Sequence, residues 1–365
     1  PNIYWLIFFR ILQGLGGGAF LPSATGIISD AFGKRRTSAI GLFASIFPIG
    51  GMIGPNVGGF ILDHLSWHWI FFINIPFGIL LIVLGTLVFP RGVSSPDSRR
   101  IDLAGAGLFS GGVLAFLFAM TAWANNPEKI SGLTWALFVL GAVLMVFFIR
   151  QESRTDHPVI DLQLLRRKEF LAANLYNFIY GATVLGMFAF IPFYAIAAYG
   201  MTAGESGLML TPRAVAVMVM AAITSLLITR LRYRLPMICG AVIMSISFFL
   251  LSQGYSDVVW FGRVVQNQVL LAAIVMLGGI GMGIVNPAAT NAVLDLLPEK
   301  IAAVTGMRGM FRVTGGVFGT AVVVVILSHF TDKAAGMEVI SLAFALLLLL
   351  LVPLAFIIPE KANTL

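Results

Sequence analysis

Four arginines lie within, or at the ends of, apolar stretches that are long enough to cross a membrane: Arg10, Arg213, Arg308 and Arg312. A charged side chain at the centre of such a helix costs about 2.5–3.5 kcal/mol unless water or a partner group receives it. Arg10 comes well after the start of its apolar stretch, about 10 Å along a helix axis. We therefore expect Arg10 to face an interior cavity, with a side chain that snorkels to the membrane surface as the alternative.

Arg308 and Arg312 stand near the start of a later apolar stretch and are separated by one helical turn. This spacing places both side chains on one face of a helix. Near a helix end, guanidinium groups commonly bind lipid headgroups or carbonyl groups. We expect that role for both of them.

A set of uncharged polar side chains marks one face of another apolar stretch. Asn174, Asn177 and Tyr180 recur every third residue, which places them on one broad helical face, and Asn286 lies at a similar depth in a later stretch. One asparagine taken alone is typical of a hydrogen bond between helices. Together these four residues are candidates for the lining of a cavity.

Carboxylates are missing from the middle of every apolar stretch. All 16 acidic residues, Asp30 and Asp295 among them, fall in connections or at the ends of stretches. A proton-coupled membrane protein needs a protonatable group within the membrane, so the sequence lacks the expected proton carrier. Cys239 is the single cysteine and the four histidines lack metal-ligand spacing; we therefore expect no disulfide, no metal and no cofactor.

Glycines recur every four residues in the second apolar stretch. Gly50, Gly54 and Gly58 share one helical face, with Pro55 and Gly59 beside them. Such a face lets a neighbouring backbone approach closely, while the proline removes a backbone hydrogen bond and bends the helix. This pattern predicts either a bent helix at a moving joint or ordinary tight packing.

Membrane-spanning helices must position all of these residues. With 59% hydrophobic and 11% charged residues, the chain is not a soluble enzyme, because soluble proteins carry about 25% charged residues. The apolar runs fit the roughly 30 Å of a bilayer core, which predicts an all-α polytopic membrane protein. Eleven spans are expected, at 3–28, 37–61, 69–89, 103–123, 133–149, 170–198, 206–229, 236–253, 265–290, 305–329 and 338–358.

Lysines and arginines concentrate in alternate connections, for example at 34–36, 166–168 and 230–234. The positive-inside rule places these connections in the cytoplasm, together with the C-terminus. The pI near 9.8 thus reports orientation in a plasma (inner) membrane, and nucleic acid is not an expected partner.

An internal repeat relates the two ends of the chain. At a constant offset of 265 residues, eleven identities recur without gaps: Gly14, Gly16, Gly18, Pro22, Ala24, Thr25, Asp30, Gly41, Gly50, Gly51 and Gly54 match Gly279, Gly281, Gly283, Pro287, Ala289, Thr290, Asp295, Gly306, Gly315, Gly316 and Gly319. The two units have the same orientation, as in many secondary transporters.

The repeat also predicts the domain organisation. Residues 1–89 would hold the last three helices of an N-terminal six-helix bundle, 90–169 an inserted helix pair with its linkers, and 170–365 a C-terminal six-helix bundle. Three more helices are expected before Pro1, so that eleven of fourteen spans are present.

Four motifs resemble the 14-span drug:proton antiporter branch of the major facilitator superfamily. They are Arg10-Ile-Leu-Gln13-Gly14, Gly50-x-x-x-Gly54-Pro55-x-x-Gly58-Gly59, Trp67-His-Trp69-Ile-Phe-Phe-Ile-Asn74-Ile-Pro76-Phe-Gly78, and His157-Pro158-Val-Ile-Asp161-Leu with 166–170. The resemblance implies the major facilitator fold and covers nearly the whole chain. The glycine and proline motif is the most specific of the four.

The resemblance also implies a function. It assigns proton coupling to Arg10, supported by Gln13 and Gly14, and places the proton-carrying acid on a first helix upstream of Pro1. The implied activity is the export of lipophilic, often cationic, compounds in exchange for protons by alternating access. Expected partners are small-molecule substrates, protons and membrane lipids, with a monomer as the working expectation.

Three other interpretations stay open to different degrees. A facilitator for a specific metabolite or anion is favoured if Arg10 binds substrate, and a truncated chain without transport activity fits the missing spans. A membrane enzyme is least favoured, because the sequence has no Ser/His/Asp set, metal cluster, Walker sequence or dinucleotide fingerprint.

Overall fold

The computed structural model is almost entirely helical. It describes residues 2–35, 39–40, 42–43, 46, 50, 53–54, 57–61, 64–88, 102–155, 158–260, 263–298 and 300–360. Within these ranges, ten helices are long and apolar enough to cross a membrane. The expected count of eleven is therefore not reproduced: the predicted span 37–61 falls on a stretch that is only partly described, although described positions such as Gly50 and Gly54 are helical.

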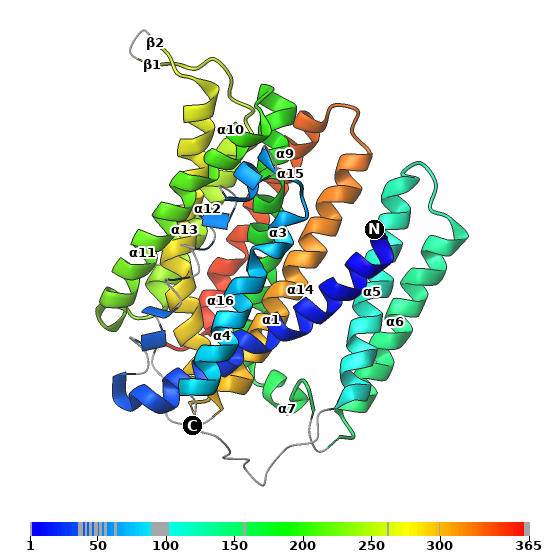
Figure 1. Cartoon of the computed structure of the whole chain (residues 1–365), viewed down its shortest axis with the longest axis vertical. Helices are drawn as coiled ribbons and strands as arrows, with labels where there is room; N and C mark the ends of the chain where they lie inside the picture. Colours follow the sequence, from blue (N-terminus) through cyan, green and yellow to red (C-terminus); the bar gives the residue numbers. More distant parts are fainter. Residues whose placement is uncertain are drawn as a thin grey trace.

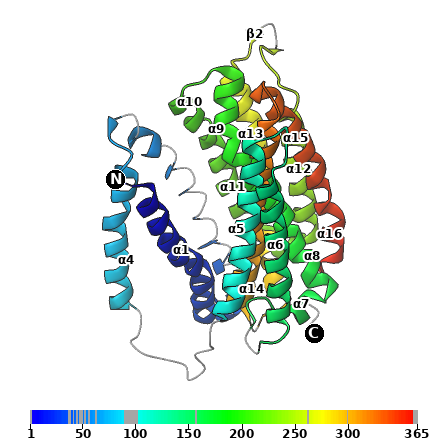
Figure 2. The same ribbon diagram turned by 90° about the vertical axis from the view of Figure 1, so that its right-hand side faces the viewer.

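The N-terminal part consists of α1 (Ile3–Phe32), a short 3-10 helix η1 (Gly33–Arg35), α3 (Trp69–Phe72) and α4 (Asn74–Val88). The side chain of Asn2 caps α1 by accepting a hydrogen bond from the backbone N–H of Tyr4. Helix α1 runs obliquely across α14, and α4 lies on its outer side (Figures 1 and 2).

Helices α5 (Leu103–Asn125) and α6 (Gly132–Glu152) fall in the region 90–169, whose status as an insertion stays a prediction, and the single turn α7 (Leu162–Leu165) follows them. The two helices pack closely, because a Cβ at Gly141 would lie 3.2 Å from the carbonyl oxygen of Gly112. The pair also contacts α14, where the rings of Phe116 and Phe318 are 6.1 Å apart. It thus forms a hairpin on the outer side of the later bundle (Figure 2).

The remaining elements form one closely packed bundle. They are α8 (Lys168–Tyr180), the π-helical segment η2 (Gly181–Leu185), α9 (Gly186–Tyr199), α10 (Ala203–Leu208), α11 (Leu210–Leu231), α12 (Arg234–Leu251), α13 (Asn267–Leu294), α14 (Ile301–Ser328), α15 (Lys333–Leu349) and α16 (Leu351–Ile357). A short antiparallel pair, β1 (Val259–Trp260) and β2 (Arg263–Val264), projects at one end (Figure 1).

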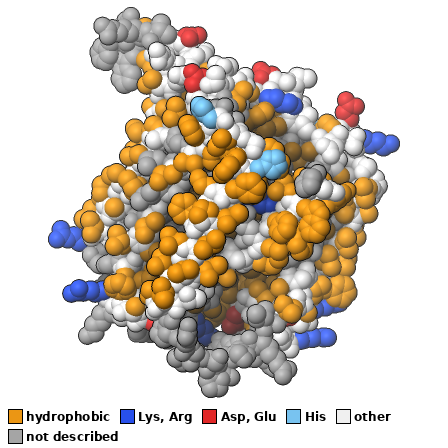
Figure 3. Space-filling model, in the orientation of Figure 1, with side chains coloured by type: hydrophobic (Ala, Val, Ile, Leu, Met, Phe, Trp, Pro, Cys, Tyr) orange, Lys and Arg blue, Asp and Glu red, His pale blue; other side chains and the backbone are white. Residues whose placement is uncertain are grey.

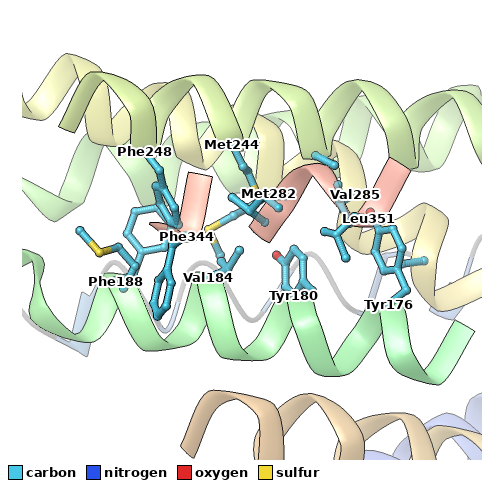
Figure 4. Close-up of a cluster of buried hydrophobic side chains, with 14 of the residues drawn as sticks. Tyr176, Tyr180, Val184, Phe188, Met244, Phe248, Met282, Val285, Phe344 and Leu351 are labelled. Atoms are coloured by element: carbon cyan, nitrogen blue, oxygen red, sulfur yellow. The ribbon is translucent and has the colours of Figure 1, made fainter. Parts of the chain in front are cut away.

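The core of this bundle follows a four-residue spacing along α8, η2 and α9. Tyr176, Tyr180, Val184 and Phe188 point towards α12, α13 and α15 (Figure 4), and all four are buried. They pack against residues such as Met244, Phe248, Met282, Val285 and Phe344, which Figure 4 shows on the facing side. Most buried side chains of the described chain belong to this core.

Glycines let α14 approach α8 and η2 at backbone distance. A Cβ at Gly315 would clash with the carbonyl oxygen of Phe178, and one at Gly319 with that of Ala182. Their repeat partners in the N-terminal part are Gly50 and Gly54. A Cβ at either of these would meet no described atom within 4 Å, so among the described residues only the C-terminal copy of this glycine pattern makes close backbone contacts.

The outer surface suits a lipid environment. Figure 3 shows hydrophobic side chains over much of the face that it draws, with the charged side chains of that face mostly towards its edges. Together with the ten long apolar helices, this distribution identifies an integral membrane protein.

Candidate functional site

A cavity of about 390 Å³ lies where α1 meets the C-terminal bundle. In its wall, the hydroxyl of Thr25 on α1 hydrogen bonds to that of Thr305 on α14, with 3.3 Å between the two oxygens. A Cβ at Gly306 would lie 3.6 Å from Pro22. The lining residues are Leu21, Thr25, Ile40, Phe43, Leu185, Arg213, Ala214, Val217, Ala221, Met282, Asn286, Pro287, Thr290, Thr305, Arg308, Gly309, Arg312 and Val313. We call this space the central cavity.

The central cavity lies between the two sequence repeats. Four pairs of its lining residues are separated by the repeat offset of 265 residues: Leu21 and Asn286, Thr25 and Thr290, Ile40 and Thr305, and Phe43 and Arg308. Equivalent positions of two related units meet in one place only near the axis that relates the units. The cavity is therefore lined by both sequence repeats, and secondary transporters bind substrates at such repeat interfaces.

One wall of the central cavity is strongly basic. Arg213 from α11 and both Arg308 and Arg312 from α14 line it, and Arg308 is only 5% exposed. All three guanidinium groups lie close enough to interact electrostatically with the hydroxyl of Tyr180. Among the described lining residues there is no aspartate or glutamate. The ion pairs in the described parts of the chain instead join Arg232 and Arg234 to Glu360.

Aromatic rings hold two of these arginines in place. The guanidinium carbon of Arg213 lies 4.5 Å from the ring centroid of Phe188, and that of Arg312 lies 5.0 Å from the ring of Tyr180. Stacking of this kind orients the guanidinium plane without neutralising its charge. The buried Nε atoms of Arg213 and Arg308 have no hydrogen-bond acceptor among the described residues, so the wall retains unused donors.

The structure places Arg308 and Arg312 in the wall of the central cavity, and their binding to lipid headgroups or helix-end carbonyls stays a prediction. Helix α14 begins at Ile301, which places Arg308 about 10 Å along the helix axis. The face shared by the two arginines points into the central cavity rather than to lipid. The four-residue spacing shows that the two side chains share a helical face, but it does not show whether that face points to lipid or to the interior of the protein.

The predicted cavity-lining residues divide into two groups. Asn286 lines the central cavity, and Tyr180 lies beneath Arg312. Asn174 and Asn177 are buried, and their amide groups donate to the carbonyl oxygens of Phe170 and Ala173, four residues earlier on the same helix. Neither of the two lines the cavity, and a substrate contact for them stays a prediction.

Arg213 was missed as a site residue. The sequence shows it as a charge near the end of a span, with no motif around it. Its position depends on tertiary contacts: a Cβ at Gly279 would lie 2.5 Å from the carbonyl oxygen of Arg213, so α11 and α13 touch at this point. The available signal was a charge inside an apolar stretch that contains no acidic residue.

Arg10 lies in a different place from the central cavity. It lines a groove of about 1000 Å³ between the start of α1 and the α3–α4 segment, together with Gln13, Trp67, Phe71 and Asn74. Its Nη1 donates to Oε1 of Gln13 at 2.9 Å, and its guanidinium carbon lies 4.7 Å from the ring centroid of Phe71. The structure thus places Arg10 and Gln13 in contact, while their role in proton coupling stays a prediction.

The remaining predicted site residues are glycines and one proline. A Cβ at Gly14, Gly50, Gly54, Gly58 or Gly59 would meet no described atom within 4 Å. Pro55 lies outside the described residues. A role of this motif in a moving joint therefore stays a prediction. In the described ranges, no group of three or more His, Cys, Asp or Glu residues is placed to hold a metal ion.

Comparison with known proteins connects this geometry to a family. The sequence model described as Major Facilitator Superfamily matches residues 1–320 and 175–364. The multidrug transporter protein MdtP of Bacillus subtilis (strain 168) is 31% identical over 323 residues, which cover 87% of this chain and 58% of that protein. Multidrug resistance protein 3 of the same organism is 29% identical, covering 91% of this chain and 65% of the relative.

A third relative and a solved structure extend the comparison. The tetracenomycin C resistance and export protein of Streptomyces glaucescens is 26% identical, covering 90% of this chain and 61% of that protein. The crystal structure of the fucose:proton symporter of E. coli aligns with a TM-score of 0.44 at 15% identity, over 92% of this chain and 87% of that one. The chain thus spans less than two thirds of the length of these three curated relatives. It belongs to the Major Facilitator Superfamily.

Proposed function

We propose that the protein is a secondary active transporter that exports lipophilic, drug-like compounds in exchange for protons. The observation that carries this proposal is the central cavity, which is lined by paired positions of the two repeats. Relatives at 26–31% identity are named for multidrug transport, multidrug resistance or export. An enzymatic function has no comparable support, because family membership and relatives both indicate transport.

Alternating access is the proposed mechanism, and the contact between α1 and α14 suits it. The described contact is built from small groups: Pro22 against Gly306, Thr25 against Thr305, and Gly26 against Ala302, whose Cβ would be 3.4 Å from a Cβ at Gly26. Such surfaces hold few interlocking side chains, so one half can rock against the other at little energetic cost. Opening this contact would connect the cavity to the nearby side of the membrane.

Arg10 is the proposed residue for proton coupling. Its guanidinium is fixed between Gln13 and Phe71 in the groove beside α1, away from the substrate cavity. A fixed positive charge can bias the protonation of a carboxylate that approaches the groove in one transport state. Gln13 would orient the guanidinium, and Gly14 leaves the neighbouring turn open.

The test uses the complete protein in proteoliposomes that carry a pH gradient and a lipophilic fluorescent dye. We expect dye movement to require the gradient, and Arg10→Ala to abolish it. Arg150→Ala, which changes an exposed arginine outside both the groove and the cavity, should retain activity. Dye movement that is independent of the gradient in the wild type would overturn proton exchange, and unchanged movement in Arg10→Ala would remove Arg10 from the mechanism.

Orientation in the plasma membrane is part of the same proposal. The end of the molecule that carries Arg230, Arg232 and Lys300 is proposed to face the cytoplasm, with the C-terminus on that side. A fluorescent-protein fusion to the C-terminus should be bright, and an alkaline phosphatase fusion at the same place inactive. The reverse pattern would invert the topology.

A further inference from the structure

We propose that the central cavity selects small amphipathic organic anions, that is, an aromatic or aliphatic body carrying one carboxylate or sulfonate. This inference rests on the proposed function only in assuming that the central cavity is the substrate site. It departs from the cationic preference that the family resemblance suggests. The argument has a charge component, a geometric component and an apolar component.

The charge component is an uncompensated basic wall. Arg213, Arg308 and Arg312 line one space, and no acidic residue lines it in the described part of the chain. Arg308 and Arg312 also repel each other. Buried charges are stabilised by opposite charge or by hydrogen-bond acceptors, and the Nε atoms of Arg213 and Arg308 have neither among the described residues. An incoming anion supplies both.

The geometric component is the convergence of donors from three elements. Arg308 and Arg312 line the cavity from one face of α14, Arg213 lines it from α11, and Asn286 lines it from α13. The rings of Phe188 and Tyr180 hold two of the guanidinium groups. Planar guanidinium groups fixed in this way match the paired oxygens of a carboxylate or sulfonate.

The apolar component is the opposite wall. Leu21, Ile40 and Phe43 are the repeat counterparts of Asn286, Thr305 and Arg308, and all six line the same cavity. At these three pairs the N-terminal unit supplies hydrocarbon and aromatic surface where the C-terminal unit supplies polar groups, whereas the fourth pair, Thr25 and Thr290, is polar in both units. A ligand that satisfies both walls has an anionic head towards α11 and α14 and an apolar body towards α1.

A cationic ligand fits this cavity poorly. Its charge would face three guanidinium groups without a described carboxylate nearby, and repulsion between like charges is strong where the effective dielectric constant is low. A neutral ligand would bury its apolar body but leave the arginine donors unused. The expected order of affinity is anion, then neutral compound, then cation.

Binding of three ligands with the same ring system tests this order. The complete protein, purified in nanodiscs of neutral lipid, is titrated with 2-naphthoate, 2-naphthalenemethanol and a naphthyl trimethylammonium ion by calorimetry. We expect naphthoate to bind at least about tenfold more tightly than the alcohol, because hydrogen bonds to a charged group contribute more than neutral ones. Equal affinities, or tightest binding of the cation, would overturn the proposal.

Variants identify the residues responsible. Arg308→Gln should weaken naphthoate binding about tenfold or more and leave binding of the alcohol unchanged, whereas Arg308→Lys should retain part of the preference. Arg213→Gln provides an independent test on another helix if Arg308→Gln fails to fold. Phe43→Ala should weaken the binding of both ligands. Arg150→Gln, which changes an arginine outside the cavity, should weaken the binding of neither. Unchanged naphthoate binding in folded Arg308→Gln and Arg213→Gln would overturn the assignment.

Anionic lipid is a second possible source of the same chemistry. Repeating the titration in nanodiscs that contain phosphatidylglycerol distinguishes the two sources. We expect naphthoate affinity to change by less than about twofold; strong competition by the lipid would assign the cavity to lipid headgroups and overturn the proposal.

The binding test is separable from the test of proton exchange. Anion-selective binding without gradient-driven movement would retain this inference and remove the antiport mechanism. Proton-driven export without a preference for anions would retain the antiport mechanism and overturn this inference.

Discussion

Arg308 carries a positive charge in the interior of the protein, on helix α14. It is buried, it lines the central cavity, and its Nε has no acceptor in the described part of the chain. Such a group is unfavourable for folding unless something else requires it. Residues that conflict with local stability are expected at functional sites.

Replacing this charge with an apolar side chain should therefore not destabilise the protein. For Arg308→Met we expect an unfolding temperature equal to or above that of the wild type in detergent, because desolvation of the guanidinium is relieved. Binding of naphthoate should be lost in the same variant. A large decrease in unfolding temperature would show that Arg308 has a structural role instead.

A second residue-scale prediction concerns the C-terminal end. Nη1 of Arg232 donates to Oε2 of Glu360 at 2.7 Å, and Arg234 lies 3.7 Å from the other oxygen. The hydrogen bond from Arg232 lowers the pKa of the Glu360 carboxyl. Because the folded-state pKa is lowered, the contribution to stability is present above the usual glutamate pKa and is lost as the pH falls through the lowered value.

Comparing Glu360→Gln with the wild type over that pH range measures this contribution. We expect a small difference in unfolding temperature at neutral pH, since the pair is exposed and screened by salt, and no difference in acid. A difference that persists in acid would show that the charge of Glu360 is not its source.

At the scale of the elements, glycine contacts distinguish the two repeats. A Cβ at Gly281 on α13 would lie 2.6 Å from the carbonyl oxygen of Gly240 on α12. At its repeat partner Gly16 on α1, a Cβ would meet no described atom within 4 Å. Within the part of the chain that the structure describes, a glycine of the same repeat position thus packs closely in α13 but not in α1.

Matched substitutions follow from this difference. Gly281→Ala should destabilise the protein by about 1–3 kcal/mol, the usual range for overpacking, whereas Gly16→Ala should be neutral or slightly stabilising because alanine favours helix. Thermal unfolding of the two variants measures the contrast. Equal effects would contradict the described difference in packing.

Helix positions were predictable from the sequence, but their interruptions were not. The predicted span 170–198 corresponds to α8, η2 and α9, yet nothing in its apolar pattern indicated the π-helical turn at Gly181–Leu185. That turn lies where α14 approaches at backbone distance, with Gly181 against the carbonyl oxygen of Arg312. Its position depends on a partner more than 100 residues away in the sequence, so no local pattern can report it.

The candidate site was predictable to a lesser extent for the same reason. Depth in an apolar stretch singled out Asn286 as cavity lining, and the structure places it there. The inward direction of Arg308 and Arg312, and the approach of Arg213 from another helix, follow from the packing of α11, α13 and α14. Arg10 was expected in a cavity and lies in a groove of its own.

At the scale of the whole molecule, the two halves meet through α1 and α14 at one end of the central cavity. Thr25 and Thr305 are both 3% exposed there, and their hydroxyl oxygens are 3.3 Å apart. A covalent link at this position would hold the halves together on that side. Transport by alternating access requires this contact to open.

Thr25→Cys combined with Thr305→Cys, in a Cys239→Ser background, tests this requirement. The short distance between the two side chains is compatible with a disulfide. We expect an oxidant to stop transport and a reductant to restore it, while either single cysteine variant remains active under both conditions. Continued transport by the oxidised, cross-linked protein would contradict alternating access at this contact.

Three of the four paired cavity positions differ in polarity, which has a consequence for how such proteins diverge. A duplicated sequence supplies each wall with equivalent backbone positions, yet Phe43 and Arg308 belong to separate copies and can be exchanged independently. The small residues at the contact between α1 and α14 need not change when a residue of the cavity wall is substituted. After duplication, the cavity residues of one repeat can therefore keep their contacts with the apolar part of a ligand, while those of the other repeat change the headgroup that is preferred.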